Sequence, residues 1–138
     1  MTARRRVTTR ATTRVDAVAY LAKAKEFLRA AQDSFQLGNY VAAASNAVHA
    51  GIASCDAISS FRVGSVWVGE HGAAAAHVQA AGAEGRQAAS QIRRLMPLKH
   101  RAEYDPRPLS VTEARAAVRS AERLVVIADR VALSALGE

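Results

Sequence analysis

The sequence is poor in the residues that build disulfide-bonded cores, sheets and membrane spans. Its one cysteine, Cys55, excludes an intrachain disulfide and a cysteine-rich metal site, and we expect it to be a small core residue. The three prolines all lie after position 96, and aromatic residues make up only 5% of the chain. No apolar run approaches the roughly 18 residues of a membrane span, and no apolar segment follows the basic N-terminus as in a secretion signal. We therefore expect a cytoplasmic protein that makes no use of a membrane.

What the sequence does contain favours helices. Half of its 138 residues are hydrophobic, and alanine supplies much of that half. A chain of this length forms one domain with a single core. Because small aliphatic side chains fill a core best when helices approach closely, the composition predicts an all-α protein, with one helical domain over residues 14–136.

The positive charge is concentrated at one end of the sequence. The chain carries a formal charge of +7, of which +5 comes from arginines in residues 1–14, where there is no acidic residue. This Arg/Thr-rich segment has no periodic apolar face, so we expect residues 1–13 to be a disordered tail. Such an arm is suited to DNA or RNA phosphates, or serves only solubility.

Apolar periodicity and capping residues predict where the helices lie. The first starts near Thr13, with Asp16 as capping carboxylate, and the last starts at a Ser110–Glu113 capping box. Between them the pattern predicts a helix from Tyr40, a loop after Phe61, a short helix over 72–80 and a helix from about 86 until "DPRP" ends it. The apolar stripes expected for the three clearest helices are Ala17, Leu21, Ala24, Leu28, Ala31 and Phe35; Tyr40, Ala44, Ala47, Gly51, Cys55 and Ile58; and Val111, Ala114, Val118, Ala121, Val125, Ala128 and Ala132.

The common catalytic motifs are missing. There is no Gly-rich phosphate loop, no His-Glu-x-x-His and no Gly-x-Ser-x-Gly elbow. His71 and His77 are six residues apart, which does not suit shared metal ligation on a helix. We therefore predict neither a metal nor a cofactor. Asn46 and His49 share one face of the second helix, where they either flank a cleft as candidates for binding RNA phosphate or form an ordinary solvated surface.

The stretch "RRLMPLKHRAEYDP", residues 93–106, has the most chemical content. Arg94 and His100 are separated by five residues and Arg93 and His100 by six. Arginine binds a phosphate bidentately, and histidine exchanges a proton with a ribose hydroxyl near neutral pH. Lys99, Arg101 and Tyr104 would add phosphate contacts. The alternative is structural, since basic residues in a last turn complement the helix dipole without any further function.

The chain resembles the HEPN superfamily, in particular small actinobacterial members, over about residues 15–130. The segments that carry the resemblance are "FQLGNYVAAASNAVHAGIASCDAI" and "KHRAEYDPRPLSVTEA". It implies an up-and-down bundle of four to five helices that forms a two-fold homodimer and bears an Arg-x(4–6)-His motif at the dimer cleft. Arg94 and His100 fit that spacing, whereas Arg93 better fits the polar residue that often follows the arginine. Leu95 and Pro97 depart from the pattern.

The resemblance implies a protein that engages RNA. Many members are metal-independent endoribonucleases in which the 2′-hydroxyl attacks the phosphodiester, and some are toxins with a cognate partner such as a nucleotidyltransferase-like antitoxin. The resemblance also leaves room for a non-catalytic bundle, since other members lack the motif and act as binding or assembly modules. A third alternative is DNA binding through the N-terminal arm, although no recognition helix is evident.

Overall fold

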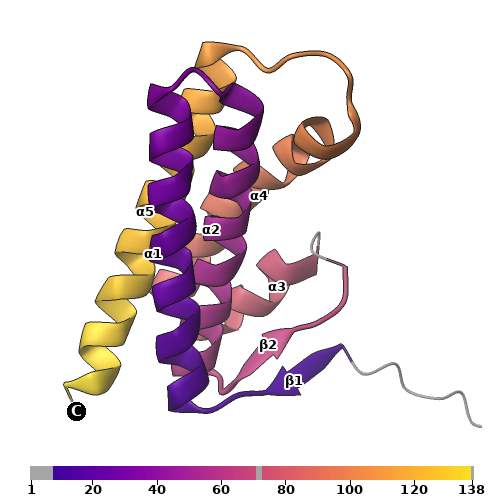
Figure 1. Ribbon diagram of the computed structural model, residues 1–138. Helices are drawn as coiled ribbons and strands as arrows, with labels where there is room; N and C mark the ends of the chain where they lie inside the picture. Colours follow the sequence, from indigo (N-terminus) through magenta and orange to yellow (C-terminus); the bar gives the residue numbers. More distant parts are fainter. Residues whose placement is uncertain (1–7, 71–72, 138) are drawn as a thin grey trace, which may run out of the picture.

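The computed structural model describes residues 8–70 and 73–137, which form an all-α bundle. Four long helices follow one another in up-and-down order (Figure 1). They are α1 (Arg14–Gln36), α2 (Tyr40–Arg62), α4 (Ala83–Tyr104) and α5 (Val111–Leu136). The last turns of α4 lie apart from the other three at the upper right of Figure 1. The short helix α3 (Ala74–Val78) and a 3₁₀ turn, η2 (Gln79–Ala81), pack beside the start of α4. The fold class expected from composition and periodicity is confirmed.

Capping boxes fix the starts of α1 and α5, as the sequence predicts. The Asp16 N–H donates to the Thr13 hydroxyl at 3.2 Å, and the Thr13 N–H donates to the Asp16 carboxylate at 2.9 Å. The same reciprocal pair joins Ser110 and Glu113 at 3.0 and 3.1 Å. Each box satisfies two backbone donors that the first helical turn leaves without an intrahelical partner.

Helix α2 is the centre of the bundle. It packs against α1, α4 and α5, and side chains on nearly every side of it are buried. The expected stripe from Ala44 to Ile58 is buried, but Ala43, Ala50, Ser54 and Ala57 outside that stripe are buried too. The buried surface of α2 is therefore wider than the single apolar stripe expected from the sequence. Alanine, serine and glycine on all faces allow three neighbouring helices to approach α2 at once.

Helix α4 is longer than the sequence suggests. It begins at Ala83, directly after Gly82. Gly82 has a positive φ of 88° and separates α4 from the preceding 3₁₀ turn. It stays helical through Pro97, which cannot donate a backbone hydrogen bond, and ends at Tyr104 before Asp105-Pro106. The predicted end is confirmed, and the predicted start near Arg86 is late by one turn.

Two short strands lie where the sequence predicts a disordered tail and a loop. Strand β1 (Thr9–Ala11) pairs antiparallel with β2 (Ser65–Trp67), so that Arg10 lies opposite Val66. The prediction of disorder over residues 1–13 is therefore wrong for this strand, and residues 1–7 lie outside the described part. The loop expected after Phe61 likewise contains β2. Backbone pairing between distant segments gives no local periodic signal in either one.

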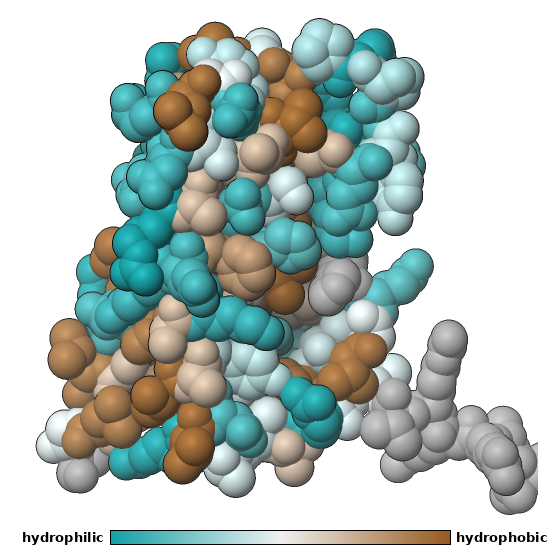
Figure 2. Space-filling view, viewed as in Figure 1, coloured by the Kyte–Doolittle hydropathy of each residue, from teal (hydrophilic) through white to brown (hydrophobic). Residues whose placement is uncertain are grey.

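The face shown in Figure 2 is mostly hydrophilic, with its largest gathering of hydrophobic residues at one end and smaller ones elsewhere. Figure 2 shows hydrophobic residues gathered at the lower left, where α5 ends and α1 begins. The exposed apolar residues of these segments are Val15, Val18, Leu133 and Leu136. None of the helices that the structure describes combines the length and the hydropathy of a membrane span.

Candidate functional site

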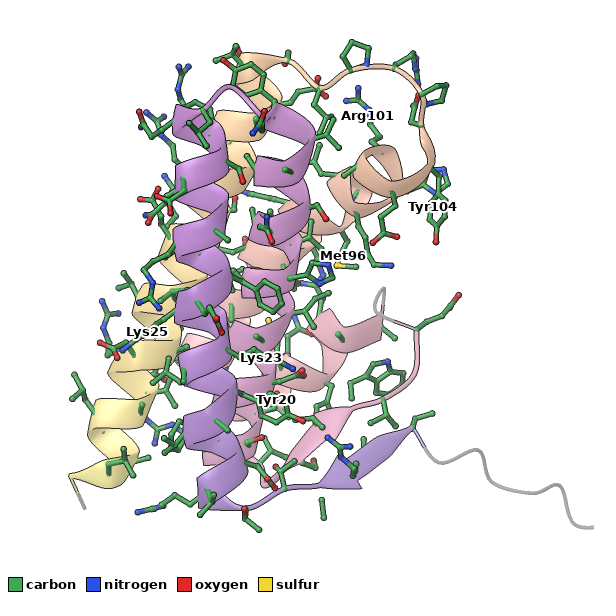
Figure 3. All side chains as sticks on the ribbon, viewed as in Figure 1. Tyr20, Lys23, Lys25, Met96, Arg101 and Tyr104 are labelled. Carbon is green, nitrogen blue, oxygen red and sulfur yellow. The ribbon has the colours of Figure 1, made fainter. Side chains whose placement is uncertain are left out.

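The outer face of α4 carries three of the residues that the sequence singles out. His100 and Tyr104 are one helical turn apart and exposed, with their ring centroids 5.3 Å from each other. Arg93 lies seven residues before His100 and is exposed. Seven residues are about two turns, so an unbent helix would bring both to the same side, although Pro97 lies between them. Figure 3 shows Tyr104 pointing away from the bundle at the end of α4. Arg93, His100 and Tyr104 are called the outer face of α4 below.

Arg94 does not belong to this face. It lines a groove against α5 together with Leu98 of its own helix. At about 100° per residue, a position six residues before His100 is rotated roughly 120° away from it. Arg93 therefore comes closer than Arg94 to the angular position of His100 on an unbent helix. Even Arg93 starts about 10 Å from His100 along the helix axis, since each residue adds about 1.5 Å.

Lys99 and Arg101 are held by carboxylates. Lys99 Nζ lies 3.7 Å from the Glu103 carboxylate one turn later. The Arg101 guanidinium forms an ion pair with Glu113 in the first turn of α5, and its Nε is buried without a hydrogen-bond partner. Figure 3 places Arg101 under the connection between α4 and α5. These contacts give Arg101 a structural role, the fastening of the two helices, that spacing did not reveal.

In the part of the chain that the structure describes, no hydrogen bond joins Asn46 or His49 to the candidate residues of α4. The Asn46 side chain donates to the Ala42 carbonyl at 3.0 Å within its own helix. His49 is exposed and stacks on Phe27 of α1, with the ring centroids 5.1 Å apart and the planes at 29° to each other. Both contacts fit the wet-surface interpretation of this face of α2.

The remaining histidines do not form a metal centre in the part of the chain described. His77 Nε2 lies 3.2 Å from the Ser65 carbonyl and 3.3 Å from its hydroxyl, which ties α3 to β2. The Trp67 indole donates to the Glu70 carbonyl at 2.6 Å beside it. His71 lies outside the described residues. No group of three or more metal-ligating side chains occurs among residues 8–70 and 73–137.

Sequence reasoning missed the contribution of α5. Arg119 and Arg123 line the same groove as Arg94, and neither has a carboxylate within ion-pair distance in the described part of the chain. From the periodicity of the sequence, one can say only that both arginines lie outside the apolar stripe of α5. Their i, i+4 spacing is a signal that they share a face, but only the packing of α5 on α4 brings Arg94 to them.

A partly buried carboxyl group, that of Asp56, lies in α2. Burial raises the pKa of Asp56 to about 7, although Arg10 and Lys23 nearby act to lower it. Arg10 comes from β1 and donates to the Tyr20 hydroxyl at 2.6 Å. Cys55 beside it is fully buried, and desolvation raises the pKa of its thiol, so this cysteine is a core residue as expected.

Asp56 should make the protein less stable as the pH rises through neutrality. The folded state holds the Asp56 proton up to about pH 7, whereas an unfolded chain releases it near pH 3.8. The stabilising contribution of the protonated form is therefore complete below about pH 4 and is lost as the pH rises to about 7. We expect Asp56→Asn to be more stable than wild type at pH 8 by about 2 kcal/mol, discounted for the accessible part of the side chain.

Urea unfolding of both proteins at about pH 5 and pH 8 measures this difference. The Asp56→Asn substitution should remove most of the pH dependence between the two conditions. An equal loss of stability with pH in wild type and Asp56→Asn would contradict the assignment of that dependence to Asp56.

Comparison with known proteins does not assign the chain to a family. No protein-family model matches the chain, and no curated protein matches it either. The structure itself supports an all-α bundle whose α4 presents an aromatic pair on one side and an arginine-lined groove on another.

Proposed function

We propose that this protein is a HEPN-like bundle that engages RNA through the outer face of α4. The observation that carries the proposal is the exposed His100–Tyr104 ring pair with Arg93 two turns earlier on the same side. Single-stranded RNA is bound by stacking its bases on aromatic or histidine rings while basic side chains hold its phosphates. In the described chain no carboxylate lies within ion-pair distance of Arg93, so its charge remains for a ligand.

The finer proposal is metal-independent endoribonuclease activity in a homodimer. His100 would take the proton of the 2′-hydroxyl as that oxygen attacks the adjacent phosphorus. The bond to the 5′-oxygen breaks, that oxygen takes up a proton, and a 2′,3′-cyclic phosphate remains. A second protomer is needed because Arg93 and His100 of one chain are about 10 Å apart along the helix axis. Two-fold pairing of α4 outer faces would supply a guanidinium from one chain to the histidine of the other.

RNA cleavage in the presence of EDTA tests both levels of the proposal. We expect His100→Ala to lower the cleavage rate about 100-fold or more, as for loss of a general acid–base group, with little change in RNA affinity. We expect Tyr104→Ala to weaken binding of a single-stranded 12-mer about tenfold, since it removes one stacking surface. Tyr104→Phe is the matched control and should bind as wild type, because it keeps the ring.

The outcomes distinguish RNA binding from RNA cleavage. Equal cleavage by wild type and His100→Ala contradicts the role of His100. RNA binding without cleavage by any variant leaves a binding protein and overturns the nuclease. Absence of both binding and cleavage rejects RNA as the ligand of this face.

The hydrophobic end of the bundle favours a second candidate, a non-catalytic module that binds a protein. Val15 and Leu133 are 79% and 71% exposed at this end, which is unusual for large apolar side chains that have no partner. The partner would be a second copy or a cognate antitoxin of the nucleotidyltransferase-like kind. Co-purification of a defined partner from the native host, together with no RNA binding, would favour this candidate over the first.

A further inference from the structure

The strand β1 is fastened to the bundle mainly by polar contacts. All three of its residues are exposed, and its pairing partner is β2 rather than a long helix. At its two ends the Val68 N–H donates to the Thr8 carbonyl at 2.8 Å, and the Thr12 N–H donates to the Gly64 carbonyl at 2.9 Å. A segment that buries little apolar surface and depends on exposed hydrogen bonds opens without unfolding of the rest. We call residues 8–12 the strap, because they can leave while the four long helices stay packed.

Two side-chain contacts hold the strap over α2. The Thr12 hydroxyl donates to the Ser60 hydroxyl at 2.8 Å, and Arg10 Nη2 donates to the Tyr20 hydroxyl at 2.6 Å. Ser60 lies one turn after Asp56 in α2, so both side chains are on the same side of that helix. Arg10 is near enough to Asp56 for its charge to lower the pKa of the carboxyl. The strap therefore covers the turn of α2 that contains Asp56.

Few charged groups surround Asp56. The titratable and charged side chains on the elements around it are Arg10 of β1, Tyr20 and Lys23 of α1, His49 and Cys55 of α2 and His77 of α3. Figure 3 shows Lys23 and Tyr20 on the same side of α1, above β1. Within residues 8–70 and 73–137, Arg10 and Lys23 are the cations that act on Asp56, and no hydrogen bond or ion pair joins either one to its carboxyl. Burial outweighs both charges and raises the pKa of Asp56 to about 7.

We propose that the strap is a pH-dependent device, which stays over α2 while Asp56 is protonated and leaves α2 when Asp56 ionises. Ionisation creates a carboxylate that no described group hydrogen-bonds, and departure of the strap gives that carboxylate water. Arg10 does not remove this cost, because its guanidinium is held by the Tyr20 hydroxyl. Release detaches from the bundle a segment that holds four arginines in its first twelve residues.

The direction of the effect follows from the pKa of Asp56 in the two states. Under the strap this pKa is about 7, and in water the group titrates near 3.8. Docking of the strap is therefore coupled to uptake of a proton. The contribution of this proton to docking is complete below about pH 4, is lost by at most about tenfold per pH unit above that, and is exhausted above about pH 7.

Nuclear magnetic resonance of the full chain between about pH 5 and pH 8 tests the proposal. The Cα and carbonyl chemical shifts of residues 8–12 report the fraction of released strap, and far-UV circular dichroism reports the helices. In wild type we expect the released fraction to rise at least about tenfold between about pH 5 and pH 7.5 at constant helix content. Asp56→Asn should keep the strap docked throughout, because its side chain is neutral at every pH.

Two further variants serve as controls. Asp33→Asn removes the same charge from an exposed site near the end of α1 and should release the strap as wild type does. Tyr20→Phe removes only the hydroxyl that Arg10 donates to, so it should weaken docking at every pH and shift release to lower pH. Tyr20→Phe also keeps the test decisive if Asp56→Asn does not fold. Since Arg93 and His100 take no part, the strap is independent of the function proposed for the outer face of α4.

The outcomes support the device or overturn it. Release in wild type at constant helix content, with none in Asp56→Asn, supports it. Equal release in wild type and Asp56→Asn assigns the pH response to His49 or His77, which that variant retains, and overturns the role of Asp56. A strap that stays docked up to pH 8, or docks more firmly as the pH rises, overturns the proposal. Loss of helix content together with the strap shows global unfolding and overturns it as well.

Discussion

Leu95→Ala should lower the free energy of unfolding by about 3 kcal/mol, within the range measured for large-to-alanine changes in cores. Leu95 is fully buried and points at α2, where its Cδ1 atom would be only 2.7 Å from a Cβ built on Gly51. Removal of its side chain leaves a cavity where α2, α4 and α5 meet. Two-state urea denaturation followed by far-UV circular dichroism measures the loss.

A second substitution in the same contact makes the prediction sharper. Gly51→Ala alone should destabilise the protein by about 1 kcal/mol, because its methyl group meets Leu95, Ile92 and Leu124 at 2.7–3.1 Å. In the Leu95→Ala background that methyl group enters the cavity, and alanine is the better helix former. Gly51→Ala should then cost nothing or stabilise. Additive effects of the two substitutions would show that the residues do not share this contact.

Gly85→Ala should cost about 3 kcal/mol, the upper part of the range for overpacking. A Cβ at this position would overlap the Val78 carbonyl oxygen and lie 2.8 Å from the Ala81 Cβ. The first obstacle is backbone, so no side-chain rotation relieves it. The 3₁₀ turn η2 and the end of α3 would have to move away from α4. We expect faster amide hydrogen exchange over residues 74–81 in addition to the loss in global stability.

Gly38→Ala is the matched control for a glycine substitution. Gly38 has a φ of 78°, and no atom lies within 4 Å of a Cβ built there. Alanine at this position would suffer only the strain of the left-handed backbone, about 1–2 kcal/mol. Exchange over residues 74–81 should be unchanged. An effect of Gly85→Ala no larger than that of Gly38→Ala would contradict the steric explanation.

The burial of Leu95 also explains one departure from the Arg-x(4–6)-His pattern. The residue after Arg94 is apolar because Leu95 is one of the largest fully buried side chains of the bundle. Arg94 beside it lines the groove against α5, and Arg93 is exposed. The choice between the two arginines could not be made from spacing, because both separations are compatible with the pattern.

Local information in the sequence was sufficient for the starts of α1 and α5 and for the end of α4. Thr13 with Asp16 and Ser110 with Glu113 each satisfy backbone donors through residues three apart. The stripe of α5 from Ala114 to Ala132 is buried, and the aspartate–proline pair after Tyr104 ends α4. Interactions over three or four residues govern all of these features, so one sequence was enough to predict them.

Which side chains meet across the bundle depends on packing between distant segments. Arg10 reaches Tyr20 through the pairing of β1 with β2, which turned part of an expected disordered tail into a strand. Through the packing of α4 on α5, Arg101 forms an ion pair with Glu113, and Arg94 lines one groove with Arg119 and Arg123. The all-α bundle and the basic stretch over 93–106 could be predicted from local patterns. The separation of that stretch into an outer aromatic face and an inner arginine groove depends on the angular position of each residue relative to a neighbouring helix, which no local pattern contains.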